Sequence, residues 1–167
     1  MASFRDRIVG AAKLSVATYE EVEHDNGATG QAIAIVVLSS LAASLGSGAQ
    51  LGAGSLLRGT LTSILSWFIW AALTYFIGTK ILATPSTRAT WGELLRTTGF
   101  AASPGMLRIL GIIPFTSALV FLVTAIWMLI AFVIAVQAAL DYEYVWRAVA
   151  VCFVGWVIYV TFGIFIM

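Results

Sequence analysis

The side chains that could do chemistry gather in the segment 20–25, which holds the only histidine of the chain, His24. A histidine there could ligate the metal of a porphyrin or chlorin at a membrane surface, or make a pH-sensitive contact. Carboxylate oxygens are ligands for hard divalent cations, and the segment carries Glu20, Glu21, Glu23 and Asp25. Because no glycine-punctuated loop of ligand spacing surrounds these acids, we interpret them as a solvated helix face beside an interfacial histidine. Cofactor ligation by His24 is the second interpretation.

The chain lacks the residues for a catalytic site in which a histidine activates a nucleophile. It has one histidine and one cysteine, and Cys152 lies inside an apolar run, which is typical of a small buried hydrophobe. We therefore predict no enzymatic activity, no disulfide framework and no metal cluster. The centres of the apolar segments 61–82, 115–140 and 145–167 carry no ionisable residue, which argues against an ion pump or a proton-coupled transporter.

The composition indicates that these side chains are positioned by membrane-spanning helices. Of the 167 residues, 60% are hydrophobic and 10% are charged, and the mean hydropathy is +0.98. A soluble domain of this size cannot bury so much apolar surface, so the solvent must be lipid. A net charge of +1 offers no field that would attract nucleic acid. The acids near the N-terminus exclude a signal peptide, so the spans themselves attach the protein.

Five segments are apolar and long enough to cross a bilayer about 30 Å thick at about 1.5 Å per helical residue. They are 28–48, 61–82, 94–113, 115–140 and 145–167. The sequence therefore predicts an all-α, polytopic bundle with about five transmembrane helices. Residues 1–27 are expected to be a separate N-terminal segment, in which 3–25 forms a short interfacial helix with Gly10 as its only strong breaker. A partly ordered tail is the alternative. The transmembrane domain is expected to be 28–167.

The third segment contains residues that interrupt a helix. Thr90 and Glu93 have the spacing of a capping box, which predicts a helix start. Pro104 removes a backbone donor and is expected to kink the helix near 101–103, with Gly99 among the interrupting residues. Because lipid offers no partner to freed backbone groups, this helix should pack among the others. Pro114 is expected to form a tight turn into 115–140. A re-entrant or interfacial helix is the alternative.

Small and polar residues in the spans indicate helix packing. A stripe with one small residue every four positions lets helices approach closely, and it consists of Ser40, Ser44, Gly48 and Gly52. Trp127 falls near the middle of 115–140, where its N–H needs a partner on another helix, or the ring contacts a lipid or pigment. Gln137 and Arg108 are interpreted as snorkelling or hydrogen-bonding residues. A channel or carrier would need a polar cavity lined by Thr97, Thr98, Ser103, Thr124 and Gln137.

The basic residues predict the orientation. Seven of the nine lie on the side of the N-terminus if all five segments cross, and Arg58 and Arg108 lie on the other side. Because cytoplasmic loops are enriched in Lys and Arg, the N-terminus should be cytoplasmic and the C-terminus on the far side. If 94–113 did not cross, the C-terminus would be cytoplasmic.

Three stretches resemble the Yip1-domain family of small proteins with five membrane spans. They are VATYEEVEHDNGATGQAIAIVVLSSLAA, TWGELLRTTGFAASPGMLRILGIIP and TAIWMLIAFVIAVQAAL, which together cover most of the chain after Lys13. The chain resembles the short bacterial branch, whose members generally lack an assigned activity. The eukaryotic branch is associated with Rab GTPases and vesicle traffic through a long cytosolic N-terminal region, which has no counterpart in the 27 or so residues before the first span.

Function is therefore expected to lie in interaction. The leading hypothesis is a non-enzymatic scaffold or interaction protein of the bacterial inner membrane that binds other membrane subunits and lipid. One alternative is an accessory or assembly subunit of a respiratory or photosynthetic complex. The other is a channel or a carrier of a small molecule or lipid. No cofactor is predicted, and bound lipid or pigment is left open.

Overall fold

A computed structural model describes the backbone of residues 2–47 and 53–166, and the side chains of these residues except 53, 159, 160 and 162–166. The described residues form helices and turns only, which confirms the all-α class. The elements, in chain order, are α1 (Phe4–Ala12), α2 (Val16–His24), α3 (Ala28–Gly46), α4 (Ala53–Phe76), the π-helical turn η1 (Ile77–Ile81), α5 (Trp91–Phe100), the 3₁₀ helix η2 (Ser103–Ile112), α6 (Ser117–Ala139) and α7 (Val145–Ile166).

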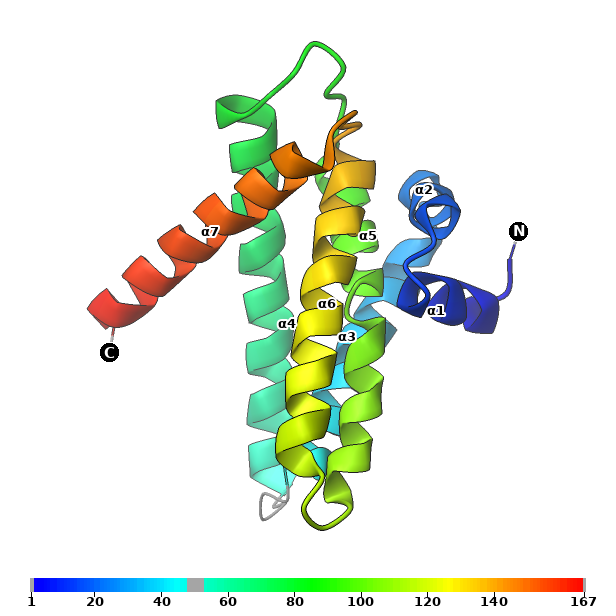
Figure 1. Ribbon diagram of the computed structural model, residues 1–167, viewed down its shortest axis with the longest axis vertical. Helices are drawn as coiled ribbons and strands as arrows, with labels where there is room; N and C mark the ends of the chain where they lie inside the picture. Colours follow the sequence, from blue (N-terminus) through cyan, green and yellow to red (C-terminus); the bar gives the residue numbers. More distant parts are fainter. Residues whose placement is uncertain (1, 48–52, 167) are drawn as a thin grey trace.

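Four rods form an up-and-down bundle, namely α3, α4 with η1, α5 with η2, and α6 (Figure 1). The fifth rod, α7, leaves the top of α6 obliquely and diverges from the bundle (Figure 1). Within the described residues, three helices are long and apolar enough to cross a membrane, over Ala28–Gly46, Gly54–Ile81 and Ser117–Ala139. A shorter apolar helix covers Val145–Ile158. A polytopic membrane bundle is thus confirmed, and its second span begins at Gly54 rather than at 61.

The third rod is broken where the sequence predicts it. Thr90 caps α5 through the expected reciprocal bonds with Glu93. The α-helix ends at Phe100, two turn residues follow, and the chain resumes as η2 with Pro104 in its first turn. The break has this form because proline offers no N–H and its ring excludes the preceding α-helical turn. Ten residues of α5 and ten of η2 span about 35 Å at their respective rises.

Close backbone contact holds η2 against α3. Gly46 lies so near the carbonyl oxygen of Arg108 that a Cβ atom at position 46 would overlap it. A Cβ atom on Gly111 would lie 2.6 Å from the carbonyl oxygen of Gly46, and one on Gly105 would overlap the Ser39 hydroxyl. The most extensive helix pair in the structure, α3 with η2, therefore depends on the absence of side chains at these positions.

The link between η2 and α6 is a β-turn over 113–116. The N–H of Thr116 donates to the carbonyl oxygen of Ile113 at 3.2 Å. Pro114 occupies the second position and Phe115 the third, with φ of 69°, which is the arrangement of a type II turn. Glycine usually fills that third position, and here the Phe115 side chain projects fully exposed from the end of the bundle.

The N-terminal segment contains two short helices instead of the single one expected. Leu14 adopts a left-handed φ of 63°, which ends α1 and turns the chain into α2. Gly10 does not break the helix as expected, because it lies inside α1 where Thr18 of α2 packs on its Cα. The hairpin of α1 and α2 lies beside α6, on the side away from α4 (Figure 1).

Candidate functional site

Two groups of polar side chains inside the bundle are candidates for function. The first group, which we call the latch, holds the hairpin of α1 and α2 on the bundle. The second lines a groove between α3, α4 and α6. The latch and the hairpin it holds contain the buried charged side chains of the described residues, namely Arg7, Glu23 and Arg96.

Arg96 of α5 forms one half of the latch. Its Nε donates to the carbonyl oxygens of Val22 and Glu23, at 3.0 Å each, and its terminal nitrogen also donates to Glu23. These carbonyls belong to the last turn of α2, where they have no partner within the helix. The side chain is 5% exposed. A buried guanidinium therefore caps α2, with the favourable charge for a helix C-terminus.

Trp127 of α6 forms the other half. Its indole N–H donates to the carbonyl oxygen of Ala12 at 2.7 Å. The neighbouring carbonyl, that of Ala11, accepts the hydroxyl of Tyr19 at 3.1 Å. Trp127 is the eleventh residue of α6, about 15 Å from its start, so the hairpin contacts the middle of α6.

Arg7 organises the charges of the hairpin itself. Its guanidinium is 2% exposed and lies 2.9 Å from Glu21 Oε1 and 2.8 Å from Asp25 Oδ2. It also donates to Gln31 of α3 at 3.1 Å. Hydrogen bonds from Arg7 hold the pKa of both carboxyl groups below the ordinary range. Two of the four acids, Glu21 and Asp25, therefore form ion pairs within the hairpin.

The other two acids line a small cavity of about 320 Å³ beside the turn that follows α6. Glu20, Glu23 and His24 meet Gln137 and Asp141 there. His24 is exposed, and its Nδ1 lies 2.8 Å from the carbonyl oxygen of Glu20. Burial raises the pKa of Glu23 to about 7. The described residues contain no group of three His, Cys, Asp or Glu side chains placed to hold a metal ion.

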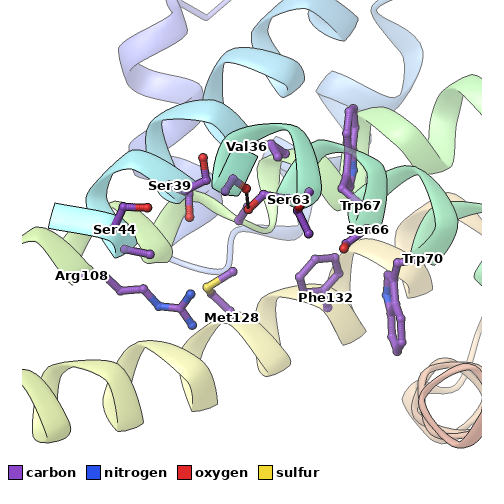
Figure 2. Close-up of a pocket in the computed structure, with 15 residues that line it drawn as sticks. Val36, Ser39, Ser44, Ser63, Ser66, Trp67, Trp70, Arg108, Met128 and Phe132 are labelled. Atoms are coloured by element: carbon purple, nitrogen blue, oxygen red, sulfur yellow. Dashed lines mark hydrogen bonds between the residues drawn. The ribbon is translucent and has the colours of Figure 1, made fainter. Parts of the chain in front are cut away.

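The groove is a concave site with a volume of about 440 Å³. Its walls come from α3 and α4 on one side and α6 on the other, as Figure 2 shows. Trp67, Trp70, Met128 and Phe132 form its apolar end. Six hydroxyl side chains also line it, from Ser39, Ser40, Ser44, Thr62, Ser63 and Ser66.

Arg108 of η2 brings the only charge among the groove-lining residues. Its Nε donates to Thr124 Oγ1 at 3.2 Å, and its guanidinium carbon lies 5.3 Å above the Phe121 ring. In Figure 2 the guanidinium points along the groove toward Met128. No carboxylate of the described residues lies within ion-pair distance of it.

The remaining residues singled out from the sequence lie in several places. Ser40 donates to Thr60 of α4 at 3.3 Å, whereas Ser44 lines the groove. Gly99 packs against Ala32 and Trp67, and Gln137 donates to the carbonyl oxygen of Tyr142 at 3.2 Å. Gly48 and Gly52 lie outside the described residues. Of the five residues expected to line a cavity, Gln137 lines the small cavity beside the turn after α6, and none of the five lines the groove.

Sequence reasoning missed the groove. Hydroxyl residues recur three or four positions apart in two consecutive spans, at 40 and 44 in the first and at 62, 63 and 66 in the second, so each set shares one helix face. This repetition could have indicated the two hydroxyl-lined faces of the groove. It could not indicate the cation, because Arg108 comes from η2, more than forty residues after α4 begins.

Comparison with known proteins gives one result. A family model described as the Yip1 domain matches residues 15–167, which is most of the chain and includes α2 and every span. Searches among curated proteins and among solved structures gave no match.

Proposed function

The chain belongs to the Yip1 domain family, and from that premise we propose that it acts as an interaction protein in the bacterial inner membrane. Proteins of this family are generally non-enzymatic. The binding partner in this proposal is a membrane-spanning helix of another protein, and the surface that receives it is the outer face of α7.

Trp156 carries the proposal. It lies about 16 Å along α7 and is 55% exposed. Within the described residues its indole makes one ring contact, with Phe153, and no hydrogen bond. The N–H groups of Trp67 and Trp127, in contrast, donate to Thr98 and Ala12. An unpaired N–H in hydrocarbon is costly, so a partner that offers an acceptor would bind there favourably.

The surroundings of Trp156 suit a partner helix. Large apolar side chains at 146, 149, 153 and 156 follow the alternating spacing of three and four that forms one helix stripe. All four are exposed, and Trp146, Phe153 and Trp156 are aromatic. Because α7 diverges from α4 and α6 (Figure 1), no helix of the described chain covers this stripe.

Native mass measurement of the protein purified in mild detergent tests this proposal. We expect an assembly of the 17.9 kDa chain with a different membrane protein, and loss of that assembly in Trp156→Ala. A monodisperse monomer, or an assembly of identical chains only, would contradict the proposal.

We further propose that the N-terminus is cytoplasmic and the C-terminus lies on the far side, so that α5 with η2 and α7 also cross. The arrangement of the rods supports this, because α4 begins and η2 ends at the end of the bundle opposite the loop 82–90 (Figure 1). Arg58 lies near the start of α4 and Arg108 in the second half of η2. Reporter fusions after Thr84 and at the C-terminus should report cytoplasmic and far-side locations respectively. A cytoplasmic C-terminus would overturn this topology.

The groove favours a second function, the binding of a lipid or small molecule. A carrier needs a polar cavity, and the six hydroxyl groups with Arg108 supply one.

A further inference from the structure

The groove between α3, α4 and α6 has a property that helix packing does not require. Ser39 is 5% exposed, lines the groove and makes no side-chain hydrogen bond within the described residues. Buried hydroxyl groups are normally paired, so Ser39 indicates a ligand that accepts hydrogen bonds.

Arg108 indicates the charge of that ligand. The terminal nitrogens of its guanidinium donate no hydrogen bond within the described residues, and no carboxylate lies near it. A guanidinium inside a membrane is expensive unless a counter-charge accompanies it. Its planar fork matches the oxygens of a phosphate group, which it binds through two parallel hydrogen bonds.

The depth of Arg108 suits a lipid headgroup. The guanidinium is bonded to Thr124, the eighth residue of α6, which places it about 10 Å from the end of that span. Ile113, Phe115 and Leu119 surround this end of the bundle with exposed apolar side chains, so the headgroup region of the bilayer lies close by. From the guanidinium the groove continues along Met128 and Phe132 toward Trp70, which is an apolar path suited to an acyl chain.

We infer that this groove binds one anionic phospholipid, with its phosphate on Arg108 and the hydroxyl group of Ser39, and an acyl chain along Met128 and Phe132. Free phosphate compounds share the headgroup chemistry but would leave the apolar end of the groove empty. Lateral access is available, because α4 and α6 form opposite walls and do not pack closely on each other. The inference is independent of the α7 surface, so either proposal can fail alone.

Native mass spectrometry of the full-length protein, delipidated in mild detergent, tests the inference with three probes. The probes are phosphatidylglycerol, a diacylglycerol with the same acyl chains, and inorganic phosphate. We expect one tightly bound phosphatidylglycerol per chain, with the other two probes at least about tenfold weaker, as expected when a charge-assisted contact is removed. If diacylglycerol bound equally well, the proposed contact with the phosphate group would be wrong. If inorganic phosphate bound equally well, the proposal that the ligand is a phospholipid would be wrong.

Matched variants assign the site. Arg108→Gln should weaken phosphatidylglycerol binding about tenfold or more, whereas Arg58→Gln, which removes the other far-side cation outside the groove, should leave it unchanged. Undiminished binding by Arg108→Gln would overturn the inference. If that variant does not fold, the single variant Ser39→Ala keeps the charge of the groove and nearly the same volume. It should weaken binding about threefold, and unchanged binding would again overturn the inference.

Discussion

The indole N–H of Trp127 donates a 2.7 Å hydrogen bond to the carbonyl oxygen of Ala12, which lies 115 positions earlier in the chain. The bond joins the middle of α6 to the end of α1. Together with the contacts of Arg96 to the end of α2, it caps both helices of the N-terminal hairpin with side chains from the bundle. The hairpin is therefore part of the folded core rather than a loose lead into the first span.

Replacing Trp127 by Phe should test this bond directly. The ring is retained, but the carbonyl of Ala12 loses its partner in a half-buried site, so the free energy of unfolding should fall by about 1 kcal/mol. Thermal unfolding in detergent measures the change. Trp156→Phe is the control, since its N–H has no hydrogen-bond partner among the described residues, and an equal loss in both variants would contradict the assignment.

Replacing Arg96 by Met should release the hairpin. Methionine keeps the aliphatic contacts but removes the charged donors to Val22 and Glu23, at a cost of about 1.5–3 kcal/mol. Because Lys13 lies exposed in the turn between α1 and α2, trypsin cleavage after it should become about tenfold faster or more if cleavage follows local opening. Arg88→Met, at an exposed loop position, should leave the rate unchanged, and an unchanged rate in Arg96→Met would refute the role of the latch.

The pH dependence of stability should reflect Glu23. Burial raises the pKa of this carboxyl in the folded protein to about 7, from an ordinary value of 4.5. The folded state therefore holds more protons than the unfolded state between these values, and the free energy of unfolding should fall as the pH rises through that window. The raised pKa of His24, supported first by the Glu20 carbonyl, acts in the same direction at slightly higher pH.

Thermal unfolding from pH 5 to pH 8.5 measures this effect. Glu23→Gln should flatten the profile and stabilise the protein at the alkaline end, whereas Glu20→Gln, on the exposed rim of the same cavity, should keep the slope. Below pH 4.5 the lowered pKa values of Glu21 and Asp25 reverse the trend, because their stabilisation is lost as they are protonated. A profile that rises between pH 5 and 7 would contradict the assignment.

A methyl group at Gly46 should separate α3 from η2. The added Cβ would overlap the Arg108 carbonyl, and the resulting displacement should cost about 1–3 kcal/mol. Gly30→Ala is the matched control in the same helix, because nothing lies within 4 Å of its added Cβ, and it should stabilise the helix by up to about 1 kcal/mol. The two thermal shifts should have opposite signs; shifts of the same sign would show that the Gly46 contact is not tight.

Local backbone chemistry explains what could be predicted from the sequence. The break before Pro104 and the cap at Thr90 follow from missing or paired backbone donors within four residues, and both appear where expected. The turn at Leu14, in contrast, was not predicted. Leucine rarely adopts a left-handed conformation, and here the packing of α2 on Gly10 favours it. Its cause is tertiary, and no residue near it marks a turn.

Long-range contacts account for the rest. Arg96 meets Glu23, which lies 73 positions earlier, and no local pattern indicates which carbonyls a cation will cap. In the same way, the groove needs hydroxyl groups from α3 and α4 and a cation from η2. Each helix shows its own stripe in the sequence, but only the order of the rods in the bundle brings the stripes to face one another.

The proposal that α7 receives a partner helix is tested most directly by a photo-reactive amino acid at position 156 in the full-length protein in its native membrane. The control position is 65, where an exposed leucine of α4 faces outward on a different helix. We predict a cross-link from 156 to one other membrane protein and none from 65. No cross-link from 156, or the same products from both positions, would contradict the proposal.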